Sequence, residues 1–198
     1  MKSFHWCLII LVLNLAPALA DKDAASCWKG AVERVESAKD YRVVCHYTNP
    51  RGTFHLDCLA VAPNRVRTKV LQGSDRLTGT IAVYDPALSP GKVLLRFPSG
   101  SVVLREIGHQ EMKDTPLYQS LYGALIERVG KLSPTLADSS DGSEQLDFQS
   151  EDGESTSIWI NSRSEIVRAE VRKGKTVLES FRFENPAWDT GQSVSFDK

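Results

Sequence analysis

The chain has 198 residues, in which 24 Lys and Arg stand against 25 Asp and Glu, so its formal net charge at pH 7 is −1. This balance argues against nucleic-acid binding and against a general attraction to anionic membranes. Once a leader is removed, the length suits one domain with a single core and is too short for two.

The N-terminus has the pattern of a secretory signal peptide. Lys2 provides the positive start, residues 6–15 are almost all apolar, and Ala18-Leu19-Ala20 is a small-x-small cleavage pattern before Asp21. A membrane anchor is the alternative, but the apolar run is shorter than the roughly 20 residues that span a bilayer. We therefore predict a signal peptide at 1–20 that is removed, and a single exported domain at 21–198 without stable membrane insertion. Lipidation of Cys27 is disfavoured, because three charged or polar residues follow Ala20, but the sequence leaves it open.

The mature chain has three cysteines, Cys27, Cys45 and Cys58, which is an odd number for an oxidising compartment. Cys45 and Cys58 lie on the apolar parity of two predicted strands, at 41–47 and 53–61, that flank a turn. A disulfide between them requires the one hairpin register that opposes them directly. The alternative is three reduced, buried thiols, and the sequence leaves both open.

His46 and His55 lie next to these cysteines and raise the question of a metal site. Adjacent residues of a strand point to opposite faces, so Cys45 and His46 do not easily share one ligand sphere. We therefore expect neither a metal nor a cofactor.

The first half of the mature chain predicts a helix followed by an antiparallel meander. Apolar residues recur at helical spacing over 27–39, which indicates an amphipathic helix with one stripe for the core. Alternating or apolar runs separated by turn residues then predict strands at 41–47, 53–61, 65–71, 80–84, 92–97 and 101–107.

A second helix is predicted from Thr115 to Val129. Thr115 provides an N-cap and Pro116 suits the first helical position. Its apolar stripe through Leu117, Leu121, Leu125 and Val129 is unusually wide. The helix is thus either buried against a sheet or a lid over a cavity, and periodicity alone leaves both open.

The second half predicts more antiparallel strands. Residues 137–157 are rich in Asp, Ser, Gly and Glu and predict solvated loops around a short strand at 145–149. Further strands are predicted at 157–160, 165–172 and 176–184, before a polar tail at 188–198 with at most an edge strand. The fold class is therefore α+β.

Four motifs in this order carry a family resemblance. They are Leu59 to Arg67, with Ala-Pro-Asn-Arg at its centre; Ile81 to Pro86, which ends in Tyr-Asp-Pro; Asp114-Thr115-Pro116-Leu117; and the Phe181-x-Phe-x-x-Pro186 ending. Together with the element order over residues 27–186, they resemble the LolA-like family of bacterial periplasmic carriers. The chain departs from that family at Ala62, where the carriers have an arginine that closes the empty cavity, and at Ala82, where a lining tryptophan is expected. It therefore resembles a diverged member.

The resemblance implies a fold and a function. The fold is a half-barrel, a strongly curved antiparallel sheet whose concave face is covered by helices that act as a lid. The function is binding of lipid or lipoprotein acyl chains, with transport in outer-membrane lipoprotein sorting as the carrier's role. The implied location is the periplasm and the implied state a monomer. Holding an acyl chain needs no catalytic group, because each buried CH₂ contributes about 0.8 kcal/mol.

The candidate cavity residues follow from strand alternation and helix position. The alternative is that these apolar residues form a closed core without a cavity. The candidates are Val43, Cys45, Leu56, Cys58, Ile81, Val83, Leu121, Leu125 and Ile126.

Two other function classes compete. An enzyme needs a nucleophile or an acid–base pair, and His109 with Glu106 or Glu111 is the best the chain offers, without a Gly-x-Ser-x-Gly or His-Glu-x-x-His motif. We therefore expect no enzymatic activity. The other class is an envelope sensor or interaction module with the same fold, which binds a protein partner through a sheet edge or the convex face.

Overall fold

The fold is taken from a computed structural model of the chain. The residues that it describes are 23–87, 90–108, 120–140 and 142–195.

Several sequence predictions fall outside these ranges. They are the signal peptide and its cleavage site, the Thr115 cap with the start of the second helix, and His109 and Glu111 of the weak enzyme hypothesis. Within the described ranges, no helix combines the length and the apolar character needed to cross a membrane.

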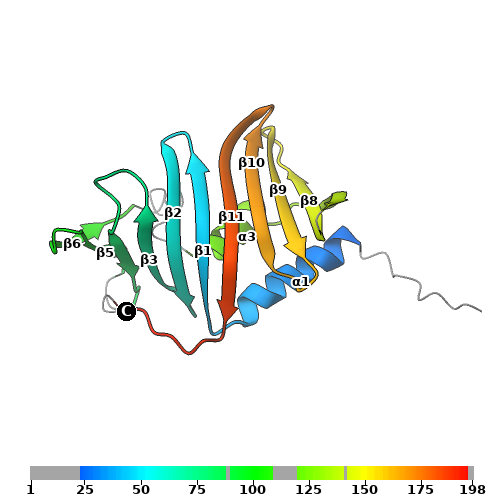
Figure 1. Cartoon of the computed structure of the whole chain (residues 1–198). Coiled ribbons are helices and arrows are strands. Elements are labelled where there is room, and N and C mark those ends of the chain that lie inside the picture. The colour runs from blue at the N-terminus through cyan, green and yellow to red at the C-terminus, as the bar shows by residue number, and fades with distance from the viewer. Residues whose placement is uncertain (1–22, 88–89, 109–119, 141, 196–198) are drawn as a thin grey trace, which may run out of the picture.

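In the described part of the chain, eleven strands form one antiparallel sheet (Figure 1). Their order across the sheet is β6-β5-β4-β3-β2-β1-β11-β10-β9-β8-β7. The strands are β1 (Asp40–Asn49), β2 (Gly52–Val61), β3 (Arg65–Gln72), β4 (Ile81–Tyr84), β5 (Lys92–Arg96), β6 (Val102–Glu106), β7 (Thr135–Ser140), β8 (Ser143–Gln149), β9 (Glu154–Asn161), β10 (Ile166–Lys173) and β11 (Thr176–Trp188).

The order shows two meanders joined along one seam. Strands β1 to β6 form the first meander and β7 to β11 the second, and each strand pairs with its neighbour in sequence. The seam is the antiparallel pairing of β1 with β11, in which Cys45 lies opposite Phe183 and His46 opposite Arg182. The sheet curves and stays open, with β6 and β7 as its edges (Figure 1). This agrees with the predicted α+β class and the predicted antiparallel meander.

Alternation gives this sheet two unlike faces. On β1, side chains at odd positions from Tyr41 to Tyr47 are buried, whereas those at even positions are at most half-buried except for Asp40 at its start. We call the first the core face and the second the polar face. The core face is closed by aromatic contacts across strands and is part of one hydrophobic cluster with both helices. Its buried members include Tyr41, Val43, Cys45, Tyr47, Leu56, Cys58, Phe181 and Phe183.

Helix α1 (Ala24–Ser37) begins at an acidic cap and packs by a narrow stripe. Asp23 is the N-cap and accepts a hydrogen bond from the Ser26 N–H at 2.6 Å, which satisfies one of the free donors of the first turn. Ala31 is fully buried. Trp28 meets Phe148 of β8 edge to face, with ring centroids 5.0 Å apart. The helix thus lies against the second meander.

Helix α3 (Leu121–Val129) is capped at both ends. Ser120 is the N-cap, and its Oγ accepts from the Gly123 N–H at 3.1 Å. Gly130 ends the helix at a φ of 49°, a conformation that glycine adopts without steric cost. The buried residues are Leu121, Tyr122, Leu125 and Val129, which confirms the predicted stripe over its described part.

Some boundaries differ from the prediction. Helix α1 starts at Ala24 rather than at 27, because Asp23 caps it. Residues 137–140 of strand β7 fall in the region predicted as loop, since Asp and Ser are typical of turns. Strand β11 extends to Trp188, four residues beyond the predicted end, because it pairs with β1 along that length.

The register does not favour the Cys45–Cys58 disulfide that the sequence left open. Cys45 lies opposite Leu56, and Cys58 lies opposite Val43. Cys45 and Cys58 are therefore diagonal neighbours, for which Cα atoms are about 7–8 Å apart, beyond the usual range of a disulfide. All three described cysteines are free and buried, in line with the reduced-thiol alternative. Burial raises the pKa of Cys45 well above its ordinary value and that of Cys58 to about 12.

Candidate functional site

A groove with a volume of about 760 Å³ lies between the C-terminal end of α1, the helix α3, the β2–β3 turn and the end of β4. We call it the α1–α3 groove. Its volume falls within the roughly 300–1,000 Å³ of typical small-molecule sites. It is the candidate functional site.

The β2–β3 turn forms one wall of the groove. Residues 60–66 all line it, and they lie inside the first motif that the sequence singled out. The turn is apolar at Ala62 and Pro63, which are joined by a cis peptide bond. The Arg65 guanidinium donates to the Ala62 carbonyl at 3.3 Å, which holds the cation against the turn. Tyr84 and Pro86 of the second motif complete this side.

Helix α3 forms the opposite wall. Gly123, Ala124, Ile126 and Glu127 line the groove, whereas the buried stripe faces the core. Because a helix presents different residues to different sides, α3 packs on the sheet and also borders the groove. The buried stripe of α3 agrees with the first interpretation that periodicity left open, a helix buried against the sheet, and the second, a lid over a cavity, stays a prediction.

A buried polar contact joins α3 to the sheet beside the groove. The hydroxyls of Tyr41 and Ser120 are 2.5 Å apart, and the Tyr122 N–H donates to the Tyr41 oxygen at 3.3 Å. Both Tyr41 and Ser120 also line the groove. Burial raises the pKa of Tyr41 far above its ordinary value, so the phenol remains neutral and serves as a hydrogen-bonding anchor.

The acidic residues of the groove have different environments. Asp40 is buried and accepts hydrogen bonds from the Thr190 side chain and N–H and from the Gly191 N–H, at 2.5 to 2.9 Å. Burial pushes its pKa up, but these hydrogen bonds outweigh burial, so the pKa is lowered. The hydrogen bonds of Asp40 thus hold the segment after β11 against the start of β1. Glu36 and Glu127 are the other acidic lining residues and leave the groove with an acidic bias.

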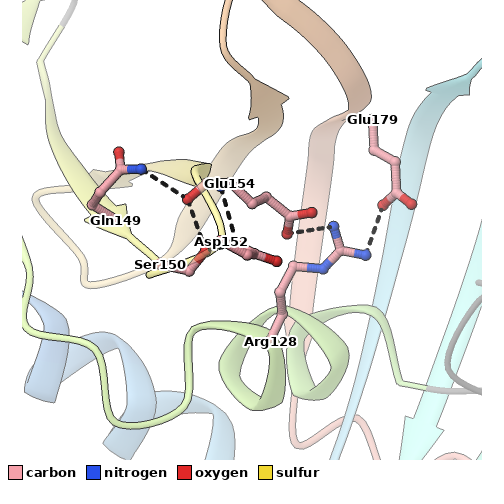
Figure 2. A network of polar contacts seen from close by, with 6 residues as sticks. All are labelled: Arg128, Gln149, Ser150, Asp152, Glu154 and Glu179. Atoms are coloured by element: carbon pink, nitrogen blue, oxygen red, sulfur yellow. Dashed lines mark hydrogen bonds and ion pairs between the residues drawn. The ribbon is translucent and has the colours of Figure 1, made fainter.

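The far end of α3 is fixed by ion pairs, as Figure 2 shows. Arg128 lies 3.8 Å from Glu154 of β9 and 3.2 Å from Glu179 of β11. The turn before β9 holds Glu154 in place, because its N–H donates to Asp152 and its carbonyl accepts from Gln149. Together with the Tyr41–Ser120 contact, Arg128 anchors α3 to the sheet at both ends.

The structure separates the nine predicted cavity residues into three groups. Ile126 lines the groove. Ile81 and Val83 lie opposite Lys69 and Arg67, in register with the polar face, while Ala82 and Tyr84 have the core parity. The prediction that Ile81 and Val83 lie on the concave core face is therefore wrong, because the register places them on the polar face. The other six belong to the buried core cluster: Val43, Cys45, Leu56, Cys58, Leu121 and Leu125. A ligand-binding role for the nine stays a prediction.

Sequence reasoning missed most of the groove. Val35 packs against the core cluster, as its place in the helical stripe predicts, and it also lines the groove. The residues of the β2–β3 turn were recognised as a motif without a role. The sequence feature that could have revealed the groove is the first motif, because a turn as apolar as Val-Ala-Pro is unusual for a solvated loop. Most residues that line the groove are Val, Ala, Ile, Pro or Gly, so its wall offers mainly apolar contact beside the two carboxylates of Glu36 and Glu127.

No family model matches the sequence, and no curated protein matches it. Solved structures do match the fold. An uncharacterised conserved protein from Thermus thermophilus is 11% identical, with 81% of this chain and 86% of that chain covered and a TM-score of 0.54. A chain of the Pseudomonas aeruginosa MucA/MucB complex is 10% identical, with 86% of this chain and 59% of that chain covered and a TM-score of 0.50.

A LolA superfamily protein from Nitrosomonas europaea is also matched, at 12% identity over 83% of this chain and 92% of that one. Its TM-score of 0.36 is too low to support an argument. The chain spans about three fifths of the matched chain of the MucA/MucB complex. At such identities, the first two likenesses show a shared fold, and the fold alone does not determine what is bound.

Proposed function

We propose that this chain is an exported, non-enzymatic protein of LolA-like type that binds lipid or lipoprotein acyl chains in the α1–α3 groove. Its role would be that of a periplasmic carrier in lipid transport or outer-membrane lipoprotein sorting. The observation that carries the proposal is the groove itself, whose wall is built mainly from apolar residues of the two family-like motifs and of α3.

The chemistry of the wall supports an acyl chain over a polar metabolite. A site for a polar ligand presents a few convergent charged or hydrogen-bonding groups. In this groove Asp40 and Tyr41 are already engaged within the protein, and Arg65 is held by the Ala62 carbonyl. An alkyl chain needs none of them, since burial of each CH₂ contributes about 0.8 kcal/mol.

The anchoring of α3 constrains how a ligand reaches the groove. A carrier that opens by swinging α3 would have to break the Tyr41–Ser120 contact at one end and the Arg128 ion pairs at the other. We propose instead that α3 is a fixed wall and that the acyl chain enters alongside the β2–β3 turn. Besides its flanking strands, a backbone hydrogen bond from the Ala62 N–H to the Lys39 carbonyl, at 2.9 Å, holds this turn.

The test is lipid analysis of the native protein. Residues 1–198 are expressed with export to a bacterial periplasm, purified without detergent, denatured and extracted, and the extract is analysed by mass spectrometry beside an unrelated exported protein. We expect near-stoichiometric enrichment of acylated species. An extract that equals the control would count against tight lipid retention.

A pair of alanine-to-tryptophan variants locates the ligand. Ala124 lines the groove on α3, and Ala124→Trp fills it. Ala187 is an exposed alanine of β11 outside the groove, and Ala187→Trp is the matched control. We expect Ala124→Trp to lower bound lipid about tenfold, which corresponds to ~1.4 kcal/mol, and Ala187→Trp to leave it unchanged. Equal lipid in both variants would place any ligand elsewhere.

The second candidate is an envelope sensor or interaction module that binds a protein partner. It is favoured by the edge strand β6, where Val102, Val103 and Leu104 are consecutive and each about half exposed. An exposed apolar edge is a template for strand addition by another chain. Val103→Lys on this edge should abolish capture of such a partner and leave bound lipid unchanged, which separates the two functions.

A further inference from the structure

Three potential metal ligands from three different strands meet on the polar face. They are His46 of β1, His55 of β2 and Glu184 of β11. Each offers a ligand atom, and these atoms all lie within 4.8 Å of one another. Among the described residues, no other group of three or more His, Cys, Asp or Glu side chains has this proximity.

The sheet register creates the cluster. His46 lies directly opposite His55 in the β1–β2 hairpin, so their side chains are neighbours on one face. The imidazole rings stack with centroids 4.0 Å apart. On the other side of β1, Glu184 lies opposite Val44, which is two residues from His46 and on the same face. Glu184 Oε1 therefore reaches to 3.3 Å from His46 Nε2.

The cysteine neighbours play no part in this arrangement. The sequence argued against a metal because Cys45 and His46 point to opposite faces, and the structure does bury Cys45 in the core. That argument excludes Cys45 as a ligand, but it does not apply to His46 and His55, which lie on the same face of the sheet. The third ligand comes from a strand about 140 residues further along the chain, which hairpin spacing does not reveal.

We propose that His46, His55 and Glu184 form a binding site for a borderline divalent transition metal, with Zn²⁺ as the reference ion. Two imidazoles and one carboxylate are a donor set that Zn²⁺ takes in proteins, with water as a fourth ligand. Bonds of 2.0–2.2 Å in a tetrahedron put ligand atoms about 3.3 Å apart. The His46–Glu184 pair already has that separation, and only His55 has to move closer.

A buried nitrogen supports a ligand at this place. His55 Nε2 is inaccessible to solvent and has no hydrogen-bond partner among the described groups. Such an atom costs free energy unless something satisfies it. A metal ion bound to His55 Nε2 would satisfy this nitrogen. Nδ1 of the same ring would then be free to hydrogen-bond to a neighbouring group.

The main competitor for the carboxylate is Arg182. Its Nε lies 3.8 Å from Glu184 Oε1, but its side chain is three-quarters exposed. An exposed ion pair of this length is weak, so a metal can displace it at little cost. Metal binding would thus replace the weak Arg182–Glu184 ion pair by metal–ligand bonds that cross the β1–β11 seam and link the two meanders.

The experiment is calorimetric titration of the exported, signal-cleaved protein with ZnCl₂ after treatment with a chelator and dialysis. We expect saturable binding of one Zn²⁺ per chain, a rise in Tm with Zn²⁺, and no binding of Mg²⁺, which prefers oxygen ligands. Cu²⁺ should bind more tightly than Zn²⁺. Absence of saturable Zn²⁺ binding overturns the proposal.

Single variants test the ligand set. His46→Gln, His55→Gln and Glu184→Gln should each weaken Zn²⁺ binding at least about tenfold, since even outer-shell losses cost 10–100-fold. The sequence offers a matched control in His109→Gln, because His109 is the remaining histidine after residue 20. It should bind Zn²⁺ as the wild type does.

Two outcomes would assign the binding to something else. Equal losses in His46→Gln and His109→Gln would indicate nonspecific coordination and overturn the proposal. Unchanged affinity in the His46→Gln/His55→Gln double variant would do the same. Tm without metal shows that each variant folds, and the half-exposed position of His46 makes a glutamine there tolerable. Lipid loading is measured in parallel and is expected to be independent of Zn²⁺.

Discussion

The two faces of the sheet bury different kinds of side chain. The core face is covered by aromatic and aliphatic side chains that pack against both helices in one cluster. The polar face carries ion pairs and the histidine cluster, and yet some of its charges are as buried as core residues: Asp57 is 5% exposed and Arg67 is 7% exposed. Burial on the first face follows from hydrophobic area, and burial on the second depends on nearby opposite charge. The faces should therefore respond differently to the loss of one side chain.

The largest effect is expected on the core face. Phe148 of β8 is 1% exposed and meets Trp28 of α1. Phe148→Ala should reduce the free energy of unfolding by about 3–5 kcal/mol, through lost burial and the cavity left behind. Denaturant unfolding measures this.

The matched residue on the other face is Trp159, which lies under the Arg168 guanidinium at 4.4 Å and is only partly buried. Trp159→Ala should cost about 1 kcal/mol. Equal losses for Trp159→Ala and Phe148→Ala would remove the distinction between the faces.

The next effect concerns the buried charges of the polar face. Asp57 accepts two hydrogen bonds from Arg42 at 2.8 and 2.9 Å, and Arg67 lies 3.9 Å away. Burial, first of all, lowers the pKa of Arg67, and the Asp57 charge opposes this. Asp57→Asn leaves the buried Arg67 without its counter-charge and should cost about 3 kcal/mol.

Arg42→Gln should cost much less, because half of the Arg42 side chain is in solvent. Unfolding curves of the two variants make the comparison. A larger loss for Arg42→Gln than for Asp57→Asn would show that the exposed partner carries the interaction.

Alkaline pH is expected to weaken the core face before the polar face. Burial raises the pKa of Cys58 to about 12 from an ordinary value of 9.0, and it raises the pKa values of Cys45, Tyr41 and Tyr122 in the same direction. The folded state therefore keeps protons that the unfolded state loses. The resulting stability is fully present below pH 9 and is lost as the pH rises toward 12.

Measurement of Tm at intervals from pH 8 to pH 11 should show this decline. Cys58→Ala removes one contributing group and should make the decline shallower, even though its Tm at pH 8 is lower. A decline as steep in Cys58→Ala as in the wild type would assign the effect to the two tyrosines and Cys45.

The smallest effect is expected where the helix meets the sheet at its border. Arg128 and its partners Glu154 and Glu179 are between one fifth and one third exposed. Arg128→Gln should cost at most about 1 kcal/mol in global stability. Its local effect should be greater, with faster amide hydrogen exchange in the last turn of α3.

The Arg128→Gln variant also tests α3 as a fixed wall. If α3 must stay in place, its loosening lowers lipid retention. Higher retention in the variant would instead identify α3 as the moving lid.

The sequence predicts the parts of this fold that depend on neighbouring residues. Alternation from Tyr41 to Tyr47 assigns the core face of β1 correctly, and the helical spacing of Leu121, Leu125 and Val129 gives the buried stripe of α3. Both patterns need only local sequence, because each element repeats its own period.

Other features depend on pairings that local sequence does not determine. The four residues Ile81 to Tyr84 are all apolar or aromatic, so they have no alternation, and only the register with β3 shows which of them point to the core. The same holds for Glu184, whose nearness to His46 depends on the β1–β11 seam. The groove depends on how a turn and two helices pack together, and strand pairing alone does not determine that packing.

The seam has a consequence for the order of events during synthesis. Strand β1 finds its second partner in β11, the last strand among the described residues, so the middle of the sheet stays incomplete until residue 188 has left the ribosome. Contacts that are distant along the chain form slowly, since the intervening loop must first close. A shorter nascent chain therefore lacks the pairing that joins the two meanders.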